Sequence, residues 1–328
     1  MGAGQAGGWV AKTLIDEGFD GEIVLLGDEP YPPYERPPLS KDLLLGKVGL
    51  ESTYLWAEEL PITARYGNRV VRIDRAGSKI FLESGEVLEY DKLVLATGAR
   101  VRQIDLPGAH YLRTINDALA LHDKLKNGGP VQVVGGGWIG LEVAAAAREF
   151  GCSVTLVESA SRLCSRAAPE VLAQYLHDLH RRNGVEVRLG HPAKEAEGAL
   201  VVGVGIVPND ELAADAGLHI NGGIVVDEFC RTSDSNIYAA GDVAVLNGVR
   251  RESWLNAQNQ AIAAARSLLG KGKPYQELPW FWSDQYGVNI QLLGIAHPKH
   301  RVVVRGSFEN DRFVIFFGSI EFRVGYAA

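Results

Sequence analysis

Residues 135–159, GGGWIGLEVAAAAREFGCSVTLVES, combine a glycine-rich turn, a helix-like run and a strand that reaches an acidic residue. The preceding segment, 130–134, predicts a strand that enters the turn. In a GxGxxG pattern the first glycine allows the tight turn, the second lets a pyrophosphate approach and the third lets helix and strand pack closely. The pattern here is formed by Gly135, Gly137 and Gly140. This order of elements predicts a dinucleotide-binding unit.

Glu158 ends the second strand of this unit. It follows Gly135 by 23 positions, close to the roughly 20 expected for the acid that binds the ribose hydroxyls of the adenosine half. A carboxylate at this place repels a 2′-phosphate. The unit is therefore predicted to prefer NAD to NADP.

A second glycine turn opens the chain. The segment GAGQAGGWVAKTLIDEGF (2–19) predicts a turn and a helix, and GEIVLLGDE (21–29) predicts a strand with an acidic end. The strand that should enter this turn would precede the first residue, so we expect the natural chain to begin earlier. Two nucleotide turns, one assigned to NAD, leave the other for FAD, because a flavin accepts the hydride that NADH delivers. The glycines of this turn are Gly2, Gly4 and Gly7.

Composition restricts the class of protein. The chain has 328 residues, of which 46% are hydrophobic and 22% charged, as in folded proteins of two or three domains. A net charge of -7 argues against a surface built to bind nucleic acid. The apolar runs are shorter than the roughly 18 residues that span a bilayer, and the sequence shows no secretory signal. We expect a cytoplasmic protein that is not bound to a membrane.

Cysteine and histidine patterns suggest no metal site. Three cysteines are an odd number without a CxxC pair, which favours a reduced protein without disulfides or structural zinc. The eight histidines lack metal-ligand spacing. His177 and His180 lie three positions apart on one predicted helix, and we interpret them as part of a solvated face.

Several further motifs, together with the two glycine turns, indicate a resemblance to one known family. YDKLVLATGAR (90–100) and NIYAAGDVA (236–244) each predict a strand that enters a glycine turn. Together with the glycine turns they resemble the ferredoxin reductases of bacterial oxygenase systems, the family that includes putidaredoxin reductase. The other motifs of this resemblance are PPYERPPLSK (32–41), LRT (112–114), VGIVPN (204–209), ESWLNAQNQA (252–261) and PWFWSDQYG (279–287).

The resemblance implies an α/β fold with two dinucleotide-binding, Rossmann-like domains in a glutathione-reductase-like arrangement, plus a small C-terminal α/β domain. It implies a discontinuous FAD domain at 1–106 and 229–275, an NAD domain at 107–228 and a C-terminal domain at 276–328. The join between VEVRLG and GALVVGVG, near 191–198, is shorter than in the family. We expect residues to be missing there.

The resemblance also implies the FAD site. It places Asp28 near the adenosine ribose, with neighbouring Glu29 as the alternative. Arg36 and Lys41 are implied beside the flavin, Arg113 on the phosphates, Asp242 on the ribityl hydroxyls and Trp254 against the flavin edge. Trp280 and Trp282 are expected to pack at the flavin face, and only Trp254 is expected to neighbour the ring, with a place in the core as its alternative. The full set of implied FAD contacts is Gly2, Gly4, Gly7, Asp28, Arg36, Lys41, Val70, Thr97, Arg113, Asp242 and Trp254.

On the NAD side the resemblance implies contacts from Gly135, Gly137, Gly140, Glu142, Glu158, Arg166 and Gly205. Lys41, Glu142 and Trp254 are the implied catalytic residues. An ammonium group near the reactive flavin nitrogen stabilises the anionic reduced ring, and a carboxylate partner offsets its desolvation cost. We therefore expect Lys41 to contact Glu142; on spacing alone, a surface lysine and an unconnected glutamate is the alternative.

The expected activity is transfer of electrons from NADH through FAD to a two-iron two-sulfur ferredoxin that feeds an oxygenase, as in aromatic hydrocarbon catabolism. The ferredoxin would be of Rieske or plant/adrenodoxin type, with rubredoxin as an alternative acceptor and a monomer or loose homodimer as the assembly. Disulfide reductases of this architecture carry reactive cysteines near the flavin, but residues 29–46 contain none, so electrons should leave the flavin directly. Cys152, Cys164 and Cys230 are interpreted as structural.

Three questions stay open at the sequence level. The acceptor could be quinone, ferric iron or oxygen. The protein could instead be a redox-sensing flavoprotein of the apoptosis-inducing factor type. An acidic ferredoxin predicts a local basic patch, for which Arg250 and Arg251 are candidates, although a solvated loop explains them equally well.

Overall fold

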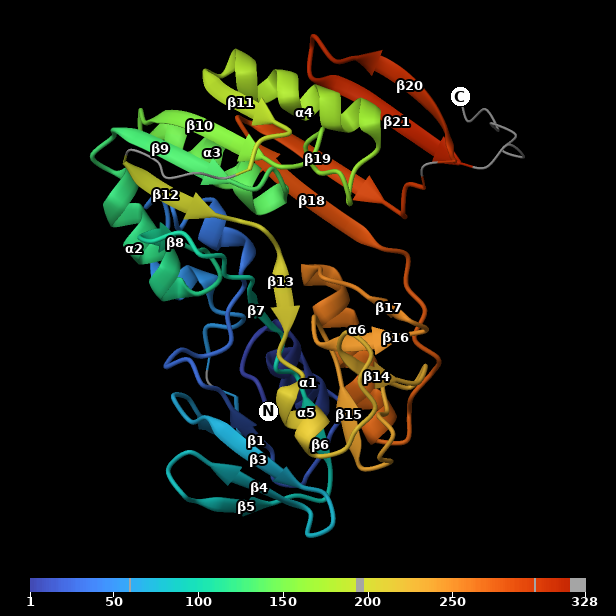
Figure 1. Ribbon diagram of the computed structural model, residues 1–328. Helices are drawn as coiled ribbons and strands as arrows, with labels where there is room; N and C mark the ends of the chain where they lie inside the picture. Colours follow the sequence, from blue (N-terminus) through green and yellow to red (C-terminus); the bar gives the residue numbers. More distant parts are fainter. Residues whose placement is uncertain (59, 193–197, 298, 319–328) are drawn as a thin grey trace. The chain divides into compact units, whose positions relative to one another are not determined.

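The computed structural model describes residues 1–58, 60–192, 198–297 and 299–318, and Figure 1 shows their path. The chain forms two compact units. Unit 1 comprises residues 1–38, 48–100 and 206–281, and unit 2 comprises 39–47, 101–205 and 282–328. Residues 193–197 of the shortened join and residues 319–328 of the predicted C-terminal domain lie outside the described residues.

Unit 2 is built around a parallel sheet of five strands in the order β11-β10-β9-β12-β8. Its central strands are rich in valine and leucine that are buried on both faces, as in Val133 and Leu156, which is typical of parallel sheets covered by helices. Its elements are β8 (Ala109–His110), α2 (Ile115–Leu125), β9 (Pro130–Val134), α3 (Trp138–Glu149), β10 (Ser153–Glu158), α4 (Glu170–Arg182), β11 (Val185–Leu189) and β12 (Ala199–Val202).

Two antiparallel hairpins follow in the C-terminal part of the chain. β18 (Trp280–Gln285) pairs with β19 (Val288–Leu293), and β20 (Arg301–Ser307) pairs with β21 (Arg312–Gly318). The turn of the second hairpin is anchored on α4, because Tyr175 donates a hydrogen bond of 2.7 Å to Asp311. Strands are thus confirmed in the segment predicted to be a small C-terminal domain.

Unit 1 places α1 (Gln5–Asp16) against α6 (Trp254–Leu268), with alanines such as Ala261 and Ala264 fully buried between them. Small side chains let the two helices approach closely. Parallel pairs join β1 to β2 and β6 to β15. The strands here are β1 (Val24–Leu26), β2 (Thr63–Arg65), β6 (Leu93–Leu95), β7 (Ala99–Val101), β13 (Ile206–Pro208) and β15 (Ile237–Ala239).

The rest of unit 1 consists of two three-stranded sheets and short helical turns. β3-β4-β5 form one sheet and β14-β16-β17 the other. These elements are η1 (Pro37–Ser40), whose last two residues belong to unit 2, η2 (Leu50–Thr53), β3 (Val70–Asp74), β4 (Lys79–Leu82), β5 (Val87–Glu89), α5 (Glu211–Asp215), β14 (Ile224–Val226), β16 (Ala244–Leu246) and β17 (Val249–Arg250).

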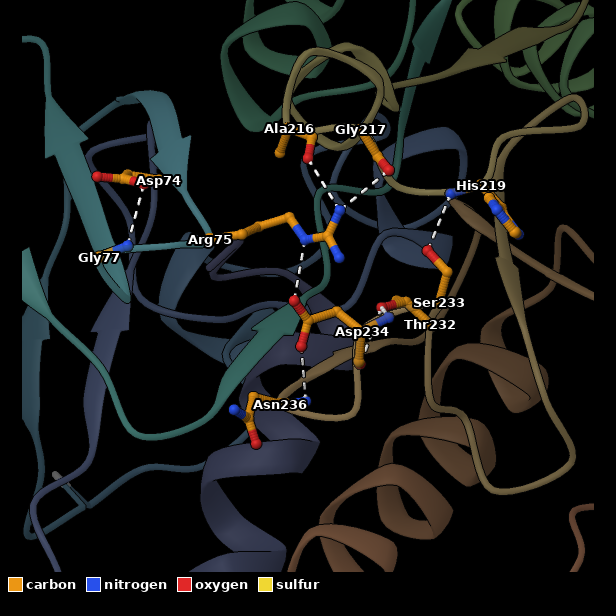
Figure 2. Close-up of polar contacts among 10 residues, drawn as sticks. All are labelled: Asp74, Arg75, Gly77, Ala216, Gly217, His219, Thr232, Ser233, Asp234 and Asn236. Carbon is orange, nitrogen blue, oxygen red and sulfur yellow. Dashed lines mark hydrogen bonds and ion pairs between the residues drawn. The ribbon is translucent and has the colours of Figure 1, made fainter.

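One arginine connects three distant segments of unit 1 (Figure 2). Arg75, in the turn after β3, donates from Nε to Asp234 at 2.9 Å and from Nη1 to the carbonyl oxygens of Ala216 and Gly217 at 3.2 and 3.0 Å. Asp234 in turn accepts from the backbone N–H of Asn236. Because the arginine satisfies two carbonyls and one carboxylate together, it fixes the β3–β4 hairpin on the segments around 216 and 234.

The α/β fold class is confirmed, and each predicted glycine turn leads into a helix, α1 in unit 1 and α3 in unit 2. The compact units divide the chain at other points than the predicted domain bounds: residues 206–228 lie in unit 1, and residues 39–47 lie in unit 2. Among the described residues, no helix has the length and apolar character needed to cross a membrane.

Candidate cofactor-binding site

Both glycine turns have the close packing that their outer glycines predict. A Cβ at Gly140 would collide with the carbonyl of Gly135, and a Cβ at Gly7 would collide with the carbonyl of Gly2. Gly135 and Gly2 also have positive φ angles of 104° and 96°, which side chains rarely adopt. The outer glycines are therefore required by the fold itself.

The middle glycines are different. Within the described residues, no heavy atom other than those of the neighbouring residues in the chain lies within 4 Å of the place that a Cβ at Gly4 or Gly137 would occupy. Both residues are helix N-caps, and a glycine cannot cap a helix with a side chain, so the first N–H groups and the positive end of the helix dipole remain available to an anion. Both turns therefore fit a pyrophosphate.

A buried amide marks the first turn further. Gln5 follows Gly4, is only 8% exposed, and neither atom of its amide has a hydrogen-bond partner among the described residues. Leaving such a group unpaired costs about 1–3 kcal/mol. The turn thus contains one donor and one acceptor that a bound polar group could satisfy.

Two backbone N–H groups hold the side chain of Glu158 at the end of β10. Its Oε2 accepts from the backbone N–H of Gly136 at 2.7 Å, and its Oε1 accepts from that of Ala160 at 2.8 Å. These bonds fix the carboxylate beside the glycine turn. The Ser159 hydroxyl also donates to Oε1 at 3.2 Å, whereas Oε2 keeps a lone pair that can accept a ribose hydroxyl.

In unit 1 the two neighbouring acids after β1 have separate environments. Glu29 accepts from the hydroxyl of Tyr34 at 2.7 Å and forms an ion pair of 2.9 Å with Arg36. Asp28 is exposed. Glu29 is therefore engaged by Tyr34 and Arg36, and the assignment of Asp28 as the ribose acid stays a prediction.

The predicted contact between Lys41 and Glu142 is confirmed. Lys41 Nζ lies 2.9 Å from Glu142 Oε1, and the side chains are 16% and 3% exposed. Ser283 donates to Oε1 at 2.6 Å, and Ser40 donates to Oε2. A carboxylate buried this deeply must be paired and hydrogen-bonded, and here it has three donors. Lys41 also lies 5.7 Å from the ring centre of Trp282.

Of the remaining residues assigned to FAD, all but Arg113 lie in unit 1. Thr97, after β6, donates from its hydroxyl to the carbonyl of Asn209 at 2.7 Å, and Val70 is buried in the core at the start of β3. Asp242 and Trp254 are half-buried, and Asp242 lies within electrostatic range of Arg36. Arg113 precedes α2 in unit 2, where its backbone N–H donates to the Asp117 carboxylate.

The remaining residues assigned to NAD lie together. Arg166 is exposed, and its Nη2 is 3.3 Å from the place that a Cβ at Gly205 would take. Gly205 has a positive φ of 102°, so a side chain there would strain the backbone as well. The two residues therefore lie close together near the end of β12, and their contacts with NAD stay a prediction.

One interpretation of the sequence is wrong. His180 does not lie on a solvated face: it is 0% exposed, whereas His177 is 18% exposed. His180 Nε2 is hydrogen-bonded to Gln285 Oε1 at 2.8 Å. The site also includes Ser40 and Ser283, which the sequence analysis did not single out. The only available signal for Ser283 was its place between aromatic residues in WFWSDQ.

All three cysteines are buried. Burial raises the pKa of Cys164 and of Cys230 to about 12, so both remain protonated thiols at neutral pH. This supports the interpretation of the cysteines as structural. The described residues contain no cluster of histidine, cysteine and acidic side chains that could hold a metal ion.

The comparisons with known proteins agree with this geometry. Residues 1–200 and 198–261 match the family model of pyridine nucleotide-disulphide oxidoreductases, and residues 280–324 match the reductase C-terminal model. The chain is 43% identical to the ferredoxin–NAD(+) reductase component of the anthranilate 1,2-dioxygenase system of Burkholderia cepacia, covering 96% of this chain and 86% of that protein.

Two solved structures are similar along almost the whole chain. The ferredoxin reductase for the CYP199A2 system of Rhodopseudomonas palustris has a TM-score of 0.92 and 39% identity, covering 97% of this chain and 87% of the other. The covalent complex of putidaredoxin reductase with putidaredoxin gives a TM-score of 0.90 at 36% identity, with 96% and 85% covered. The chain belongs to the pyridine nucleotide-disulphide oxidoreductases, within the family of ferredoxin–NAD(+) reductases of oxygenase systems.

Proposed function

We propose that this protein is an enzyme that passes electrons from NADH through FAD to a small iron-sulfur ferredoxin, which supplies an oxygenase. The observation that carries the proposal is the presence of two glycine turns, each with open space at its middle glycine. One turn is followed by the anchored acid Glu158, and the other by exposed Asp28 and the paired Glu29. Two different dinucleotides fit this arrangement better than two copies of one.

In this proposal unit 1 binds FAD. The N–H groups at the start of α1 and the amide of Gln5 contact the pyrophosphate, and Asp28 accepts hydrogen bonds from the adenosine ribose. Arg36, Val70, Thr97, Asp242 and Trp254 line the rest of the site. When bound, FAD supplies the two-electron to one-electron conversion that no side chain offers.

Unit 2 binds NADH in the same way. The start of α3 takes the pyrophosphate, Glu158 accepts from the adenosine ribose and excludes a 2′-phosphate, and Arg166 and Gly205 close the adenosine end. The Lys41–Glu142 pair keeps a fixed positive group, with its compensating carboxylate, in a largely dehydrated place. Such preorganised charge stabilises developing negative charge without reorganisation during the reaction. Arg113, after β8, remains assigned to the phosphates of FAD.

The cysteines support direct electron transfer to an external acceptor. A dithiol relay needs reactive, accessible thiolates, but Cys152, Cys164 and Cys230 are buried. Arg250 and Arg251 stay candidates for ferredoxin binding. Arg250 forms an ion pair with Glu252, and Arg251 donates to the carbonyl of Glu277 at 2.8 Å. We propose the cytoplasm as the location of this reaction.

Anaerobic stopped-flow mixing tests the proposal. The FAD-loaded protein is mixed with NADH or NADPH, and a two-iron two-sulfur ferredoxin is then added. We expect fast flavin bleaching with NADH, much slower bleaching with NADPH, and rapid ferredoxin reduction. Absence of bleaching with either nucleotide would contradict the proposal. In a separate aerobic assay without ferredoxin, oxygen consumption as fast as the bleaching would favour an oxidase.

A further inference from the structure

Five buried polar side chains of unit 2 are joined in one hydrogen-bonded cluster. They come from the segment 39–47, α3, α4 and β18, whose helices and strand are labelled in Figure 1. A buried polar group is costly unless it is hydrogen-bonded, so their connection is what allows them to be buried at all. The five, with their exposed fractions, are Ser40 (3%), Glu142 (3%), His180 (0%), Ser283 (0%) and Gln285 (2%).

Four of these residues form a continuous chain, here called the Glu142–His180 chain. Ser283 Oγ lies 2.6 Å from Glu142 Oε1, Gln285 Nε2 lies 2.9 Å from Ser283 Oγ, and His180 Nε2 lies 2.8 Å from Gln285 Oε1. Beyond its far end, the Tyr286 hydroxyl is 3.1 Å from His180 Nδ1. The chain therefore leads from the carboxylate that contacts Lys41 to an imidazole on α4.

The carboxylate gives this chain a direction. An ionised glutamate can only accept hydrogen bonds, so the Ser283 hydroxyl must donate its single proton to Glu142. Ser283 then accepts from the Gln285 NH₂ group, which turns the Gln285 carbonyl oxygen toward α4. That oxygen needs a donor, so the proton of a neutral His180 must be on Nε2, and Nδ1 must accept from Tyr286.

We propose that Ser283, Gln285 and His180 are positioning residues, which hold the Glu142 carboxylate in the orientation that keeps Oε1 directed at Lys41. This inference rests on the proposed function for the role of the Lys41–Glu142 pair, although the direction of the chain does not. Hydrogen bonds in such a series strengthen one another in a low-dielectric interior. Lys41 and Ser40 each hold one oxygen of the carboxylate. Ser283, fixed from behind by Gln285, adds a second partner on Oε1 and so restricts its rotation further.

The protonation of His180 agrees with this direction. Burial lowers the pKa of His180 to about 4, so the ring is neutral at pH 7 and carries one proton. A neutral ring can accept at Nδ1 and donate at Nε2 at the same time. The neutral state is therefore the one that fits both neighbours.

Nuclear magnetic resonance tests the direction without reference to activity. The protein is labelled with ¹⁵N in histidine, and long-range ¹⁵N–¹H spectra at pH 7 report which ring nitrogen of His180 carries the proton. We expect the neutral Nε2–H form in the FAD-loaded protein. A charged ring or the Nδ1–H form would overturn the proposal, and this result does not require any variant to fold.

The variant Ser283→Ala tests whether Glu142 sets the direction. Without the hydroxyl, the Gln285 amide is free to turn over, so we expect both neutral tautomers of His180 to be populated. Ser283→Thr keeps the hydroxyl and should retain the single Nε2–H form. If His180 keeps one unchanged tautomer in Ser283→Ala, the carboxylate does not control the chain and the proposal fails.

Rapid kinetics test the positioning role. Loss of one hydrogen bond to a charged group should lower the limiting rate of flavin bleaching by NADH about tenfold in Ser283→Ala, with little change in the NADH concentration at half-saturation. Gln285→Leu should slow the same step, but adding it to Ser283→Ala should cause no further loss, because the chain is already broken.

His177→Gln serves as the matched control, because His177 lies on the same helix and contacts only Asp178 among the hydrogen bonds described for its ring. It should keep both the wild-type rate and the His180 tautomer. Additive losses in the double variant would overturn the proposal. Absence of bleaching in the wild type would instead defeat the proposed function, and the spectra would still decide the direction of the chain.

Discussion

Unit 1 and unit 2 use the same glycine turn but bury different polar side chains around it. Apart from tyrosine and cysteine, the buried polar residues described in unit 1 are Gln5, Thr13, Thr53, Asn256 and Gln260, none of which titrates near neutral pH, whereas unit 2 buries Glu142 and His180 with three uncharged partners. The backbone turn thus provides pyrophosphate binding in both units. The surrounding side chains decide what else each unit can do, and unit 2 has the charged pair Lys41–Glu142 in its interior.

The glycines offer the largest test of this shared backbone. Gly140→Ala and Gly7→Ala place a methyl group against a backbone carbonyl, so we expect each to lower the free energy of unfolding by about 4 kcal/mol. Gly137→Ala and Gly4→Ala point into open space with permissive φ angles of -83° and -92°. These two substitutions should lower the free energy of unfolding by at most about 1 kcal/mol.

The matched pairs also separate the two cofactors. Gly137→Ala should weaken NADH binding and leave FAD bound, whereas Gly4→Ala should weaken FAD binding. Urea unfolding of the apoprotein and titration with each nucleotide give both quantities. Equal destabilisation by the middle and outer glycines would contradict the open space found in the turns.

The buried titratable groups predict a difference in pH dependence between the units. Burial, which outweighs the hydrogen bond from Gln285, lowers the pKa of His180 from 6.5 to about 4, with a smaller contribution from the charge of His177. Between these values the unfolded chain binds more protons than the folded one, so stability is full above pH 6.5 and is lost as the pH falls toward 4. The loss from this residue is about 3 kcal/mol.

His180→Gln should remove this part of the pH dependence while other acid-induced losses remain. Denaturant unfolding between pH 4 and pH 7.5, followed for wild type and variant, measures it as a difference of slopes. Parallel curves for the two proteins would show that His180 titrates normally in the folded state.

The acids near the ends of β1 and β10, one in each unit, should differ in their effect on the preference for NADH over NADPH. Glu158→Gln keeps an acceptor for Gly136 but removes the charge that repels a 2′-phosphate, so we expect the preference for NADH over NADPH to fall about tenfold, or about 1.4 kcal/mol. Asp28→Asn, the counterpart in unit 1, should leave that preference unchanged. Rates of flavin bleaching with both nucleotides provide the measurement, and a similar shift in both variants would refute this division of roles.

The smallest effect is expected at the cysteines, which are buried in both units. An aromatic disulfide reagent should find no rapidly reacting thiol in the native protein and three after unfolding. Cys164→Ala and Cys230→Ala should retain the wild-type rate of ferredoxin reduction. A large loss of this rate in a variant that still binds its flavin would indicate that a cysteine thiol takes part in electron transfer.

Local patterns predicted much of this molecule. The turn at 135–140, the helix after it and the strand that ends at Glu158 follow from glycine spacing and hydrophobic period, because each depends on neighbours in sequence. The contact of Lys41 with Glu142 was predicted only through the family resemblance. Spacing alone could not bring together two residues that are about a hundred positions apart.

Other features depended on tertiary partners that the sequence does not name. His180 resembles a surface residue on a polar helix, and only the hairpin of β18 and β19 explains its burial. Likewise, the sequence alone does not distinguish Asp28 from Glu29. They differ in the folded protein, where Tyr34 and Arg36 bind the Glu29 carboxylate. The placement of residues 39–47 in unit 2 followed from no local pattern.

The interleaving of the two units has a consequence for synthesis on the ribosome. Domains usually fold one after another as the chain emerges, but unit 1 requires residues up to 281. β6 must therefore wait for its parallel partner β15 while most of unit 2 is made. During that interval the nascent chain exposes an unpaired strand edge, which other chains can bind. Chaperones that shield such edges should accordingly matter more for the yield of this protein than for a protein of the same size whose units are consecutive in sequence.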